Sequence, residues 1–352
     1  MLKDFIDFND LSLEEWERIF NLAEDIYNNQ SKYAELYRNK ILATLFYEPS
    51  TRTRFSFQSA MYKLGGVSIG FSGTASSSVT KGESLKDTIK MVESYSDIIV
   101  IRHPKDGAAL AASLYSKVPV INAGDGKHLH PTQTLLDLFT IGKYKKFTGL
   151  NIGVCGDLLN GRTAHSLIRA FSLYTGNNFY LISSRDFKVP EKYLENLKKN
   201  NKINICGEIT DCISGLDIIY MTRLQRERID GAVERIPGGL ILNKAKLNGA
   251  KKDLLILHPL PRNEEISTDI DDDARALYFK QAEFGVYIRM ALLMILLENK
   301  NAQSNIFDKN IFDKTEKKCA NLNCIINDKD DTSNLPPLVK PDGTCAYCEH
   351  YF

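Results

Sequence analysis

Short apolar segments alternate along most of the chain with segments that carry apolar residues at helical spacing, and this alternation restricts the fold more than any other feature. Strands joined by helices form right-handed βαβ units, so we expect parallel sheets with helices on both faces. The predicted strands are 40–46, 67–71, 97–101, 118–122, 150–155, 178–182, 203–206, 217–221 and 254–257. The predicted helices are 13–27, 50–64, 85–95, 108–115, 135–141, 162–174, 191–199 and 283–299.

The alternation runs through the chain twice, which predicts two domains. A chain of 352 residues also exceeds the size of one ordinary domain. We expect an α/β fold of two doubly wound parallel-sheet domains, αβα in layering and linked by helices, with a small C-terminal extension. The predicted parts are a first domain at 1–134, a second domain at 135–282, a helix at 283–299 that packs back on the first domain, a linker at 300–317 and an extension at 318–352.

Composition limits the partners of the chain. The hydrophobic content of 43%, the charged content of 25% and the formal charge of +1 are ordinary for a globular protein. Because the chain has no basic excess, we expect no nucleic-acid partner. The N-terminus lacks the apolar core of a signal peptide, and the longest apolar run, 290–297, is too short to cross a bilayer. We therefore expect a cytoplasmic protein with no membrane partner.

The junction between the strand at 40–46 and the next helix carries Ser50, Thr51, Arg52 and Thr53. A helix start has unpaired N–H groups and a positive dipole end, so it binds anions readily. The hydroxyl groups add donors, and the arginine adds a planar cation that suits phosphate. The simplest alternative is that a hydroxyl only caps the helix. The alternation of arginine and threonine favours an oxyanion or phosphate site.

Three more polar residues stand in loops where a parallel sheet binds ligands. Arg102 follows the strand at 97–101, His130 precedes a proline, and Lys81 ends a hydroxyl-rich loop. Taken alone, Lys81 is read more simply as part of a solvated loop, and His130 as a structural histidine. The first 300 residues show no Ser-His-Asp grouping, no complete Gly-x-Gly-x-x-Gly fingerprint and no metal-ligand spacing. The chemistry indicated is positioning and electrostatic stabilisation of an anion.

Four of the seven cysteines form two close pairs near the C-terminus. Two such pairs fit a tetrahedral zinc ion held by four thiolates, which leaves no open position for catalysis. Disulfides are the alternative, and a cytoplasmic location disfavours them. A zinc ribbon that binds nucleic acid is a second alternative, but the extension lacks a clear basic stripe. The expected ligands of a structural Zn²⁺ are Cys319, Cys324, Cys345 and Cys348, and the expected packed thiols are Cys155, Cys206 and Cys212.

Five motifs occur in the order found in carbamoyltransferases, and from about residue 1 to residue 299 the sequence resembles the catalytic chains of the aspartate branch of that family. The motifs are Ser50-Thr51-Arg52-Thr53-Arg54, Lys81-Gly82-Glu83, Arg102-His103-Pro104, His130-Pro131-Thr132-Gln133 and His258-Pro259-Leu260-Pro261-Arg262. The ornithine branch has a cysteine where this chain has Pro259. The stretch from Met221 to Gln225 also looks like an aspartate-binding segment.

The resemblance implies that the amino group of L-aspartate attacks carbamoyl phosphate directly. The products are N-carbamoyl-L-aspartate and phosphate, formed through a tetrahedral intermediate in the committed step of pyrimidine (UMP) biosynthesis. No cofactor is implied for catalysis. The implied catalytic residues are Arg52, Thr53, Lys81, Arg102, His130 and Gln133.

The resemblance also assigns each substrate group to residues of this chain. The phosphate is assigned to Ser50, Thr51, Arg52 and Thr53, and the carbamoyl group to Arg102, His130 and Gln133, with Leu260 and Pro261 at the carbamoyl or amino nitrogen. The carboxylates of aspartate are assigned to Arg162, Arg223 and Gln225. Ser77 and Lys81 are expected to come from the neighbouring subunit of a homotrimer with shared active sites. Glu48 is expected to pair with Arg162 and Arg228.

The segment 318–325 resembles the zinc domain of the regulatory chain of aspartate carbamoyltransferases. The resemblance implies a natural fusion in which the extension docks on a catalytic chain and helps to hold trimers together, with larger assemblies through the extension left open. The nucleotide-binding domain of that regulatory chain has no counterpart between residues 299 and 318. We therefore expect no regulation by CTP or ATP through that route.

Two other functions stay open at this point. One is a carbamoyltransferase for ornithine or another amino acid, against which the missing cysteine after His258 and the presence of Arg223 argue. The other is a catalytically silent scaffold that binds zinc and partners. The complete set of candidate anion-binding side chains argues against a scaffold.

Overall fold

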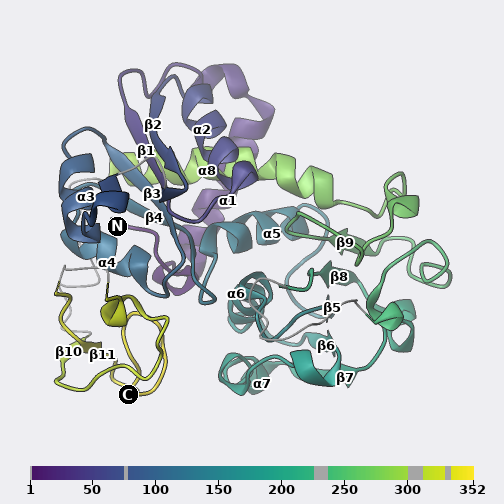
Figure 1. Cartoon of the computed structure of the whole chain (residues 1–352). Helices are drawn as coiled ribbons and strands as arrows, with labels where there is room; N and C mark the ends of the chain where they lie inside the picture. The colour runs from purple at the N-terminus through teal and green to yellow at the C-terminus, as the bar shows by residue number, and fades with distance from the viewer. Residues whose placement is uncertain (1, 75–77, 226–236, 300–311, 330–333) are drawn as a thin grey trace. The chain divides into compact units, whose positions relative to one another are not determined.

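The computed structural model describes residues 2–74, 78–225, 237–299, 312–329 and 334–352 (Figure 1). The chain divides into two compact units. The first unit comprises Met1–Thr132 and Gly285–Phe352, and the second comprises Gln133–Phe284. Residues 300–311 of the predicted linker, Ser77 and Arg228 lie outside the described residues.

A four-stranded parallel sheet forms the centre of the first unit. Strand β2 lies on one side of β1, and β3 and β4 lie on the other, so the strand order is β2-β1-β3-β4. The direction in which strands are added therefore reverses between β1 and β3. The elements are β1 (Ile41–Phe46), β2 (Val67–Ser72), β3 (Ile98–His103), β4 (Val120–Asp125), α1 (Leu13–Asn28), α2 (Thr51–Lys63), α3 (Leu85–Val92) and α4 (Ala108–Tyr115).

A five-stranded parallel sheet built on the same plan forms the centre of the second unit. Its order is β7-β6-β5-β8-β9, so the direction reverses between β5 and β8. The strands are β5 (Asn151–Cys155), β6 (Asn178–Ile182), β7 (Lys202–Cys206), β8 (Ile218–Met221) and β9 (Leu255–Leu257). The helices are α6 (Arg162–Phe171) and α7 (Leu197–Asn200), together with α5 (Pro131–Gly142) and α8 (Tyr278–Glu298), which run across the unit boundaries in sequence.

The predicted parallel α/β fold with two domains is confirmed, and the start of α1 shows how local sequence sets an element. The Ser12 hydroxyl accepts the N–H of Glu15, and the Glu15 carboxylate accepts the N–H of Ser12. This reciprocal cap satisfies donors that a helix start leaves unpaired. The helix then buries one face made of Trp16, Ile19, Ala23 and Ile26.

The predicted helix at 191–199 is wrong. The structure has a 3₁₀ turn at Glu191–Tyr193 and only the short helix α7 at Leu197–Asn200. The N–H of Leu194 bonds to the carbonyl of Glu191 at 2.8 Å, which closes a tighter turn than an α-helix allows. A segment of this length gains little from helix propagation, so local contacts decide its form. Helix α8 also begins earlier than predicted, at Tyr278.

One glycine in each unit lets the backbone pass close to a neighbouring segment of the same sheet. Gly70 has φ +134°, and a Cβ there would lie 2.1 Å from the carbonyl oxygen of Thr44. Gly156 has φ +125°, and its Cβ would lie 2.1 Å from the carbonyl oxygen of Thr222. No side chain fits at either position without moving backbone.

The C-terminal tail, described at residues 312–329 and 334–352, packs on α4 within the first unit (Figure 1). Strand β10 (Asp313–Lys314) pairs antiparallel with β11 (Leu338–Val339). The four tail cysteines and Tyr347 share one buried cluster with the alanine-rich residues 108–112 of α4. The small side chains of α4 allow the tail to approach closely.

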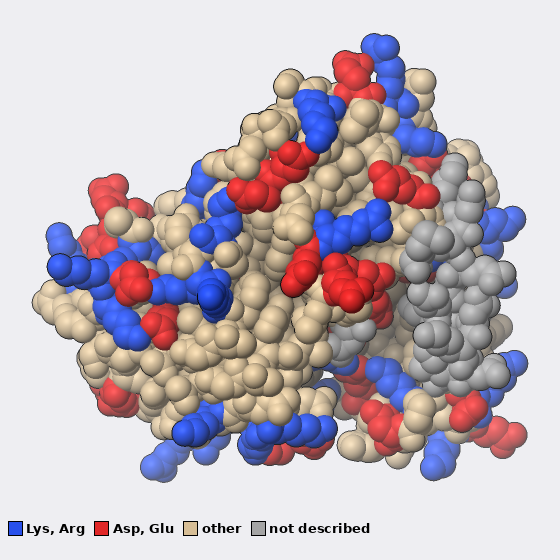
Figure 2. All heavy atoms as spheres, turned by 180° about the vertical axis from the view of Figure 1, so that it is seen from behind, with Lys and Arg blue, Asp and Glu red and all other residues tan. Residues whose placement is uncertain are grey.

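The surface carries a mixture of charges. On the face shown in Figure 2, lysine and arginine side chains are interspersed with aspartate and glutamate side chains. Among the described residues, no helix has the length and apolar character needed to span a membrane.

The close approach at Gly156 generates a stability prediction. We expect Gly156→Ala to lower the free energy of unfolding by about 2–5 kcal/mol, because it adds both left-handed strain and overpacking. Gly176→Ala is the matched control: Gly176 has φ +77°, but its Cβ would meet no atom within 4 Å. Thermal unfolding of both variants checks this, and equal melting temperatures for the two would contradict it.

Candidate active site

The start of α2 lies directly after β1, at the reversal in the first sheet. Ser50 has an extended backbone, and its hydroxyl bonds to the Thr53 hydroxyl at 3.1 Å instead of capping the helix. Thr53 is buried, Thr51 and Arg52 are exposed, and the first turn holds no acidic residue. The simple capping interpretation is therefore not what the structure shows. A positive helix end with hydroxyl groups beside it suits an anion.

Arg102 lies at the carboxyl end of β3, on the other side of the same reversal. Its backbone carbonyl accepts the N–H of Tyr47 at 2.9 Å, and its Nη2 lies 2.9 Å from Oε2 of Glu48. The Arg102 side chain is only 12% exposed. The ion pair fixes the guanidinium on the edge of the sheet that also carries the start of α2. Parallel sheets bind ligands at such reversals.

The other candidates of the first unit lie on two different loops. His130 is buried in the loop that leads from β4 to Pro131, the first residue of α5. Lys81 is exposed at the end of a 3₁₀ turn, Ser78–Lys81. Ser77, which precedes that turn, lies outside the described residues.

In the second unit, Gln133 belongs to a buried hydrogen-bond network centred on Asp137. The side-chain amides of Gln133 and Gln281 both donate to Oδ1 of Asp137, at 2.8 and 2.6 Å. The Tyr220 hydroxyl donates to Oδ2 at 2.8 Å. Burial first, and then the Asp137 charge, raise the pKa of Tyr220, so this hydroxyl stays a donor. Because its amide nitrogen is held by Asp137, Gln133 is oriented with its carbonyl oxygen as the remaining acceptor.

The same network extends to the segment His258–Arg262. Oε1 of Gln281 accepts the N–H of His258 at 3.0 Å. Nδ1 of His258 accepts the N–H of Leu260 at 2.7 Å, and Nε2 lies 2.8 Å from Oε1 of Glu265. Burial lowers the pKa of His258, which keeps the ring neutral with its proton on the nitrogen that faces Glu265.

Leu260 itself has φ +51°, a value that is rare for a residue with a side chain. The hydrogen bond from its N–H to His258 helps to hold that backbone. Its carbonyl, proposed to bind substrate nitrogen, therefore belongs to a fixed turn, and the following bond to Pro261 is cis.

The second sheet repeats the arrangement of the first at its reversal between β5 and β8. Arg162 is buried and is the first residue of α6, the helix after β5. Arg223 and Gln225 follow β8, and their side chains are hydrogen-bonded at 3.4 Å. The fully buried Asp157 accepts the N–H of Asn160 at 2.9 Å and the N–H of Gln225 at 3.2 Å. Asp157 thus ties the loop that leads to Arg162 to the segment that carries Gln225.

Sequence reasoning missed the acidic residues that hold these side chains. They are Asp137, Asp157 and Glu265, and also Glu48, for which a pairing with Arg162 and Arg228 was expected but the contact with Arg102 was not. Only Asp137 had a local signal, because it stands four residues after Gln133 on a helix and such pairs hydrogen-bond. The other three acquire their partners through strand order and loop geometry.

The four tail cysteines form a single buried cluster. Their sulfur atoms all lie within 4.8 Å of one another. The Cys319–Cys348 and Cys324–Cys345 sulfur separations are 3.4 and 3.9 Å, and a disulfide needs about 2.05 Å. Four thiolates about 2.3 Å from a zinc ion would lie about 3.8 Å apart, so these residues fit a tetrahedral metal site.

Comparison with known families covers both units. Residues 3–143 match the family model described as "Aspartate/ornithine carbamoyltransferase, carbamoyl-P binding domain", and residues 148–296 match "Aspartate/ornithine carbamoyltransferase, Asp/Orn binding domain". The chain is 53% identical over 299 residues to the aspartate carbamoyltransferase catalytic subunit of Clostridium novyi, covering 84% of this chain and 98% of the relative. Its identity to the Clostridium kluyveri subunit is 51% over 299 residues, with the same coverage.

Solved structures agree with the sequence comparison. The catalytic subunit of M. jannaschii aspartate transcarbamoylase matches with a TM-score of 0.80 and 44% identity, covering 86% of this chain and all of that one. Aspartate transcarbamoylase from Trypanosoma cruzi in complex with N-(phosphonacetyl)-L-aspartic acid matches with a TM-score of 0.78 and 34% identity, covering 83% and 94%. The tail lies beyond residue 296, where the second family match ends.

The Asp137 network generates a second stability prediction. Asp137→Ala leaves three buried donors without their acceptor, so we expect the free energy of unfolding to fall by about 3 kcal/mol or more. Asp272→Ala, at an exposed position, is the control and should change it by less than about 0.5 kcal/mol. Denaturant unfolding measures both, and a loss at Asp137 no larger than the loss at Asp272 would show that the network does not stabilise this unit.

Proposed function

The chain belongs to the aspartate/ornithine carbamoyltransferase family, and we propose that it transfers the carbamoyl group of carbamoyl phosphate to the amino group of L-aspartate. The observation that carries this is the 53% identity to an aspartate carbamoyltransferase catalytic subunit across 98% of that relative. The T. cruzi enzyme has been solved with carbamoyl phosphate, and with aspartate and phosphate. The hydrogen-bonded pair Arg223–Gln225 supports aspartate over ornithine, because a planar guanidinium recognises a carboxylate.

The first unit is the proposed carbamoyl-phosphate-binding domain, assigned to residues 1–134. The phosphate binds at the start of α2, where Ser50, Thr51, Arg52 and Thr53 supply N–H groups, hydroxyls and a cation. The position of Arg102, fixed by Glu48, supports a role at the carbamoyl oxygen. His130 acts on the same oxygen. Negative charge develops there as the carbonyl becomes tetrahedral, so fixed positive groups lower the barrier.

The second unit is the proposed aspartate-binding domain, assigned to residues 135–282. Arg162 holds the α-carboxylate, and Arg223 with Gln225 holds the side-chain carboxylate. Gln133, Leu260 and Pro261 serve the substrate nitrogen, because an oriented amide oxygen and a backbone carbonyl accept N–H donors. The common frame of Asp137, Gln281 and His258 supports this pairing of Gln133 with Leu260.

The reaction needs no covalent intermediate on these residues. The unprotonated amino nitrogen of aspartate bonds to the carbamoyl carbon, and the tetrahedral intermediate passes the surplus amine proton to a phosphate oxygen. The bond from that carbon to the bridging phosphate oxygen then breaks. Phosphate leaves while Arg52 neutralises its charge. The contribution of the protein is orientation of two anions and stabilisation of the oxyanion.

A homotrimer is the proposed assembly, with Ser77 and Lys81 acting in the site of a neighbouring subunit. An exposed apolar surface on α2 and the edge strand β2 supports burial against another copy of the chain. It comprises Phe55, Tyr62, Val67 and Ile69, whose exposed fractions are 61, 54, 50 and 41%. Apolar side chains on an open sheet edge are uncommon unless a partner covers them.

The tail is proposed to hold a structural Zn²⁺ through Cys319, Cys324, Cys345 and Cys348. The compact sulfur cluster supports this, as does the resemblance to the zinc domain of the regulatory chain. Four thiolates fill a tetrahedral zinc shell, so the ion orders the tail and takes no part in the transfer.

Substrate choice and catalysis can be tested together. With carbamoyl phosphate, the purified protein should release phosphate when aspartate is added and much less when ornithine is added. Arg52→Ala should lower kcat/KM by about 10²-fold or more, because it removes a charge that stabilises the departing phosphate.

Arg38→Ala is the control, since Arg38 is exposed and pairs only weakly with Glu35 on the surface. Its activity should stay within about twofold of the wild type. Release with ornithine but not with aspartate would overturn the substrate assignment. Absence of release with any amino acid would support the scaffold alternative.

Metal and assembly give a further prediction. The purified protein should contain one zinc per chain and sediment as a trimer or a multiple of three chains. Cys324→Ser should lower the zinc content, because three thiolates bind the ion more weakly than four. Cys206→Ser, at a thiol outside the cluster, should leave it unchanged. Zinc-free wild-type protein with a melting temperature unchanged by added zinc would contradict a structural metal site.

A further inference from the structure

Two aspartates join the loop that follows Arg102 and strand β3 to the loop that carries His130. Asp106, three residues after His103, accepts the N–H of Lys127 through Oδ1 at 2.8 Å. Asp125, at the end of β4, accepts the N–H of Gly107 through Oδ2 at 2.8 Å. Each carboxylate therefore starts on one loop and binds the other, so the two loops form a single frame.

The tail is hydrogen-bonded to the first of these loops through Asn321 and Asn323. The Asn321 amide donates to Oδ2 of Asp106 at 2.8 Å, and the Asn323 amide donates to Oδ1 at 3.1 Å and to the carbonyl of Pro104 at 3.1 Å. Backbone bonds flank these contacts, from the N–H of Asp106 to the carbonyl of Asn323 and from the N–H of Ile325 to the carbonyl of Asp106. The tail thus adds a short bridge to the chain that directly follows Arg102-His103-Pro104.

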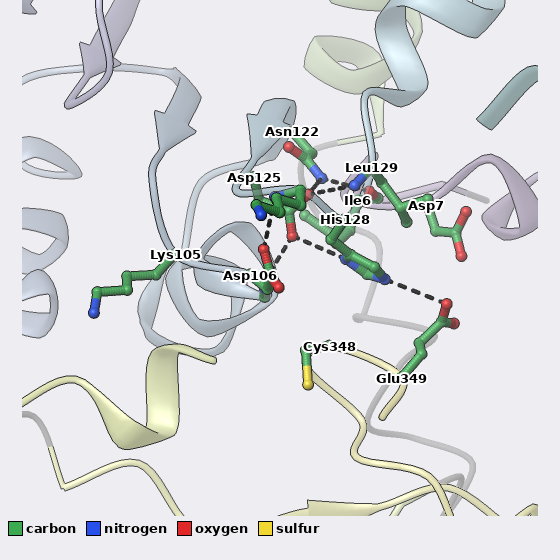
Figure 3. Close-up of polar contacts among 12 residues, drawn as sticks. Ile6, Asp7, Lys105, Asp106, Asn122, Asp125, His128, Leu129, Cys348 and Glu349 are labelled. Atoms are coloured by element: carbon green, nitrogen blue, oxygen red, sulfur yellow. Dashed lines mark hydrogen bonds and ion pairs between the residues drawn. The ribbon is translucent and has the colours of Figure 1, made fainter. Parts of the chain in front are cut away.

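The tail contacts the second loop through Glu349. Figure 3 shows His128 between Asp125 and Glu349, with Nδ1 3.1 Å from Asp125 and Nε2 3.2 Å from Glu349. Burial acts to lower the pKa of His128, but Asp125 and Glu349 outweigh it and raise that pKa to about 10. His128, two residues before His130, therefore joins the body to the tail through these two contacts.

Glycine makes both contacts possible. A Cβ on Gly107 would lie 2.4 Å from Cβ of Tyr347, and a Cβ on Gly126 would lie 1.8 Å from Oδ1 of Asp106. Both glycines have positive φ, +82° and +48°. The Cβ on Gly126 would also lie 2.9 Å from Nδ2 of Asn323, so the absence of a side chain at Gly107 and Gly126 leaves room for the tail.

We propose that the tail braces the carbamoyl site, with Asp106, His128, Asn323 and Glu349 as positioning residues for Arg102 and His130. The inference rests on the proposed function of those two side chains. It assigns the tail a task in catalysis by its own chain, in addition to any role in assembly. Loss of the brace lets the two loops shift, and a displacement of about 1 Å at a reacting group can cost about 10²-fold in rate.

The brace acts on the carbamoyl end of the substrate and leaves the phosphate end untouched. Inorganic phosphate is proposed to bind at the start of α2, which follows a different strand, whereas the contacts described above for the four positioning residues lie on the loops after β3 and β4. Carbamoyl phosphate needs that helix start together with Arg102 and His130. Loss of the tail contacts should therefore weaken the binding of carbamoyl phosphate and leave the binding of inorganic phosphate unchanged. A general loss of stability should weaken the binding of both ligands.

The test uses full-length Asn323→Ala, Glu349→Ala and their double variant. We expect the double variant to keep one zinc per chain and to lose about tenfold or more in kcat/KM for carbamoyl phosphate. The inhibition constant of inorganic phosphate should change by less than about twofold. Glu349→Gln, which retains an acceptor for His128, should recover most of the loss. Hydrogen exchange in the peptides that cover residues 104–107 and 126–129 should be faster in the double variant.

Leu322→Ala is the matched control, because Leu322 stands between the two asparagines and is 86% exposed. It should behave as the wild type. A zinc-loaded double variant with the kinetics of Leu322→Ala would overturn the brace, as would equal weakening of phosphate and carbamoyl phosphate. The single variants are measured in the same way, so the test can still be made if the double variant misfolds.

A failure of the proposed function can be distinguished from a failure of the brace, because the wild type would then release no phosphate.

Discussion

In each unit, the connections that follow two neighbouring parallel strands run to opposite faces of the sheet. One helix therefore cannot cover the ends of both strands. The crevice that results is where a parallel sheet binds ligands. In the first unit it lies between β1 and β3, and in the second between β5 and β8. The start of α2 and Arg102 stand at the first reversal, and Arg162 and Arg223 stand at the second. Strand order is thus the constraint that gathers the positive groups.

Buried carboxylates hold the chain at these strand ends. Asp157 receives backbone N–H groups from two loops, and Asp137 receives two amides and a phenol. Hydrogen bonds to an ionised acceptor are shorter and stronger than neutral ones, and a fully satisfied network in a low dielectric is rigid. Negative charge is therefore used to fix the geometry of a site whose ligands are themselves anions. Glu48 does this most directly, because its partner is the candidate catalytic Arg102.

The sequence predicted most elements and the parallel α/β fold of two domains, but it did not predict the order of the strands in each sheet. Strands of a sheet buried on both faces are continuous apolar runs, so β1 and β6 could be placed within a residue of their observed bounds. Strand order carries no such local signal, so the sequence did not predict between which strands the direction reverses. The resemblance supplied the candidate side chains and Glu48, but it indicated neither the contact of Glu48 with Arg102 nor the roles of Asp137, Asp157 and Glu265. The docking of the tail depends on Asn323 meeting Asp106 across 217 residues of chain, which no local pattern encodes.

The most direct test is a crystal structure of this protein with N-(phosphonacetyl)-L-aspartic acid, the ligand present in one of the T. cruzi structures. The phosphonate should contact the first turn of α2, the carbonyl oxygen beside it should contact Arg102, and the two carboxylates should contact Arg162 and the pair Arg223–Gln225. A phosphonate bound away from α2, with those arginines contacting only protein, would contradict the assignment of the two strand-order reversals as the substrate sites.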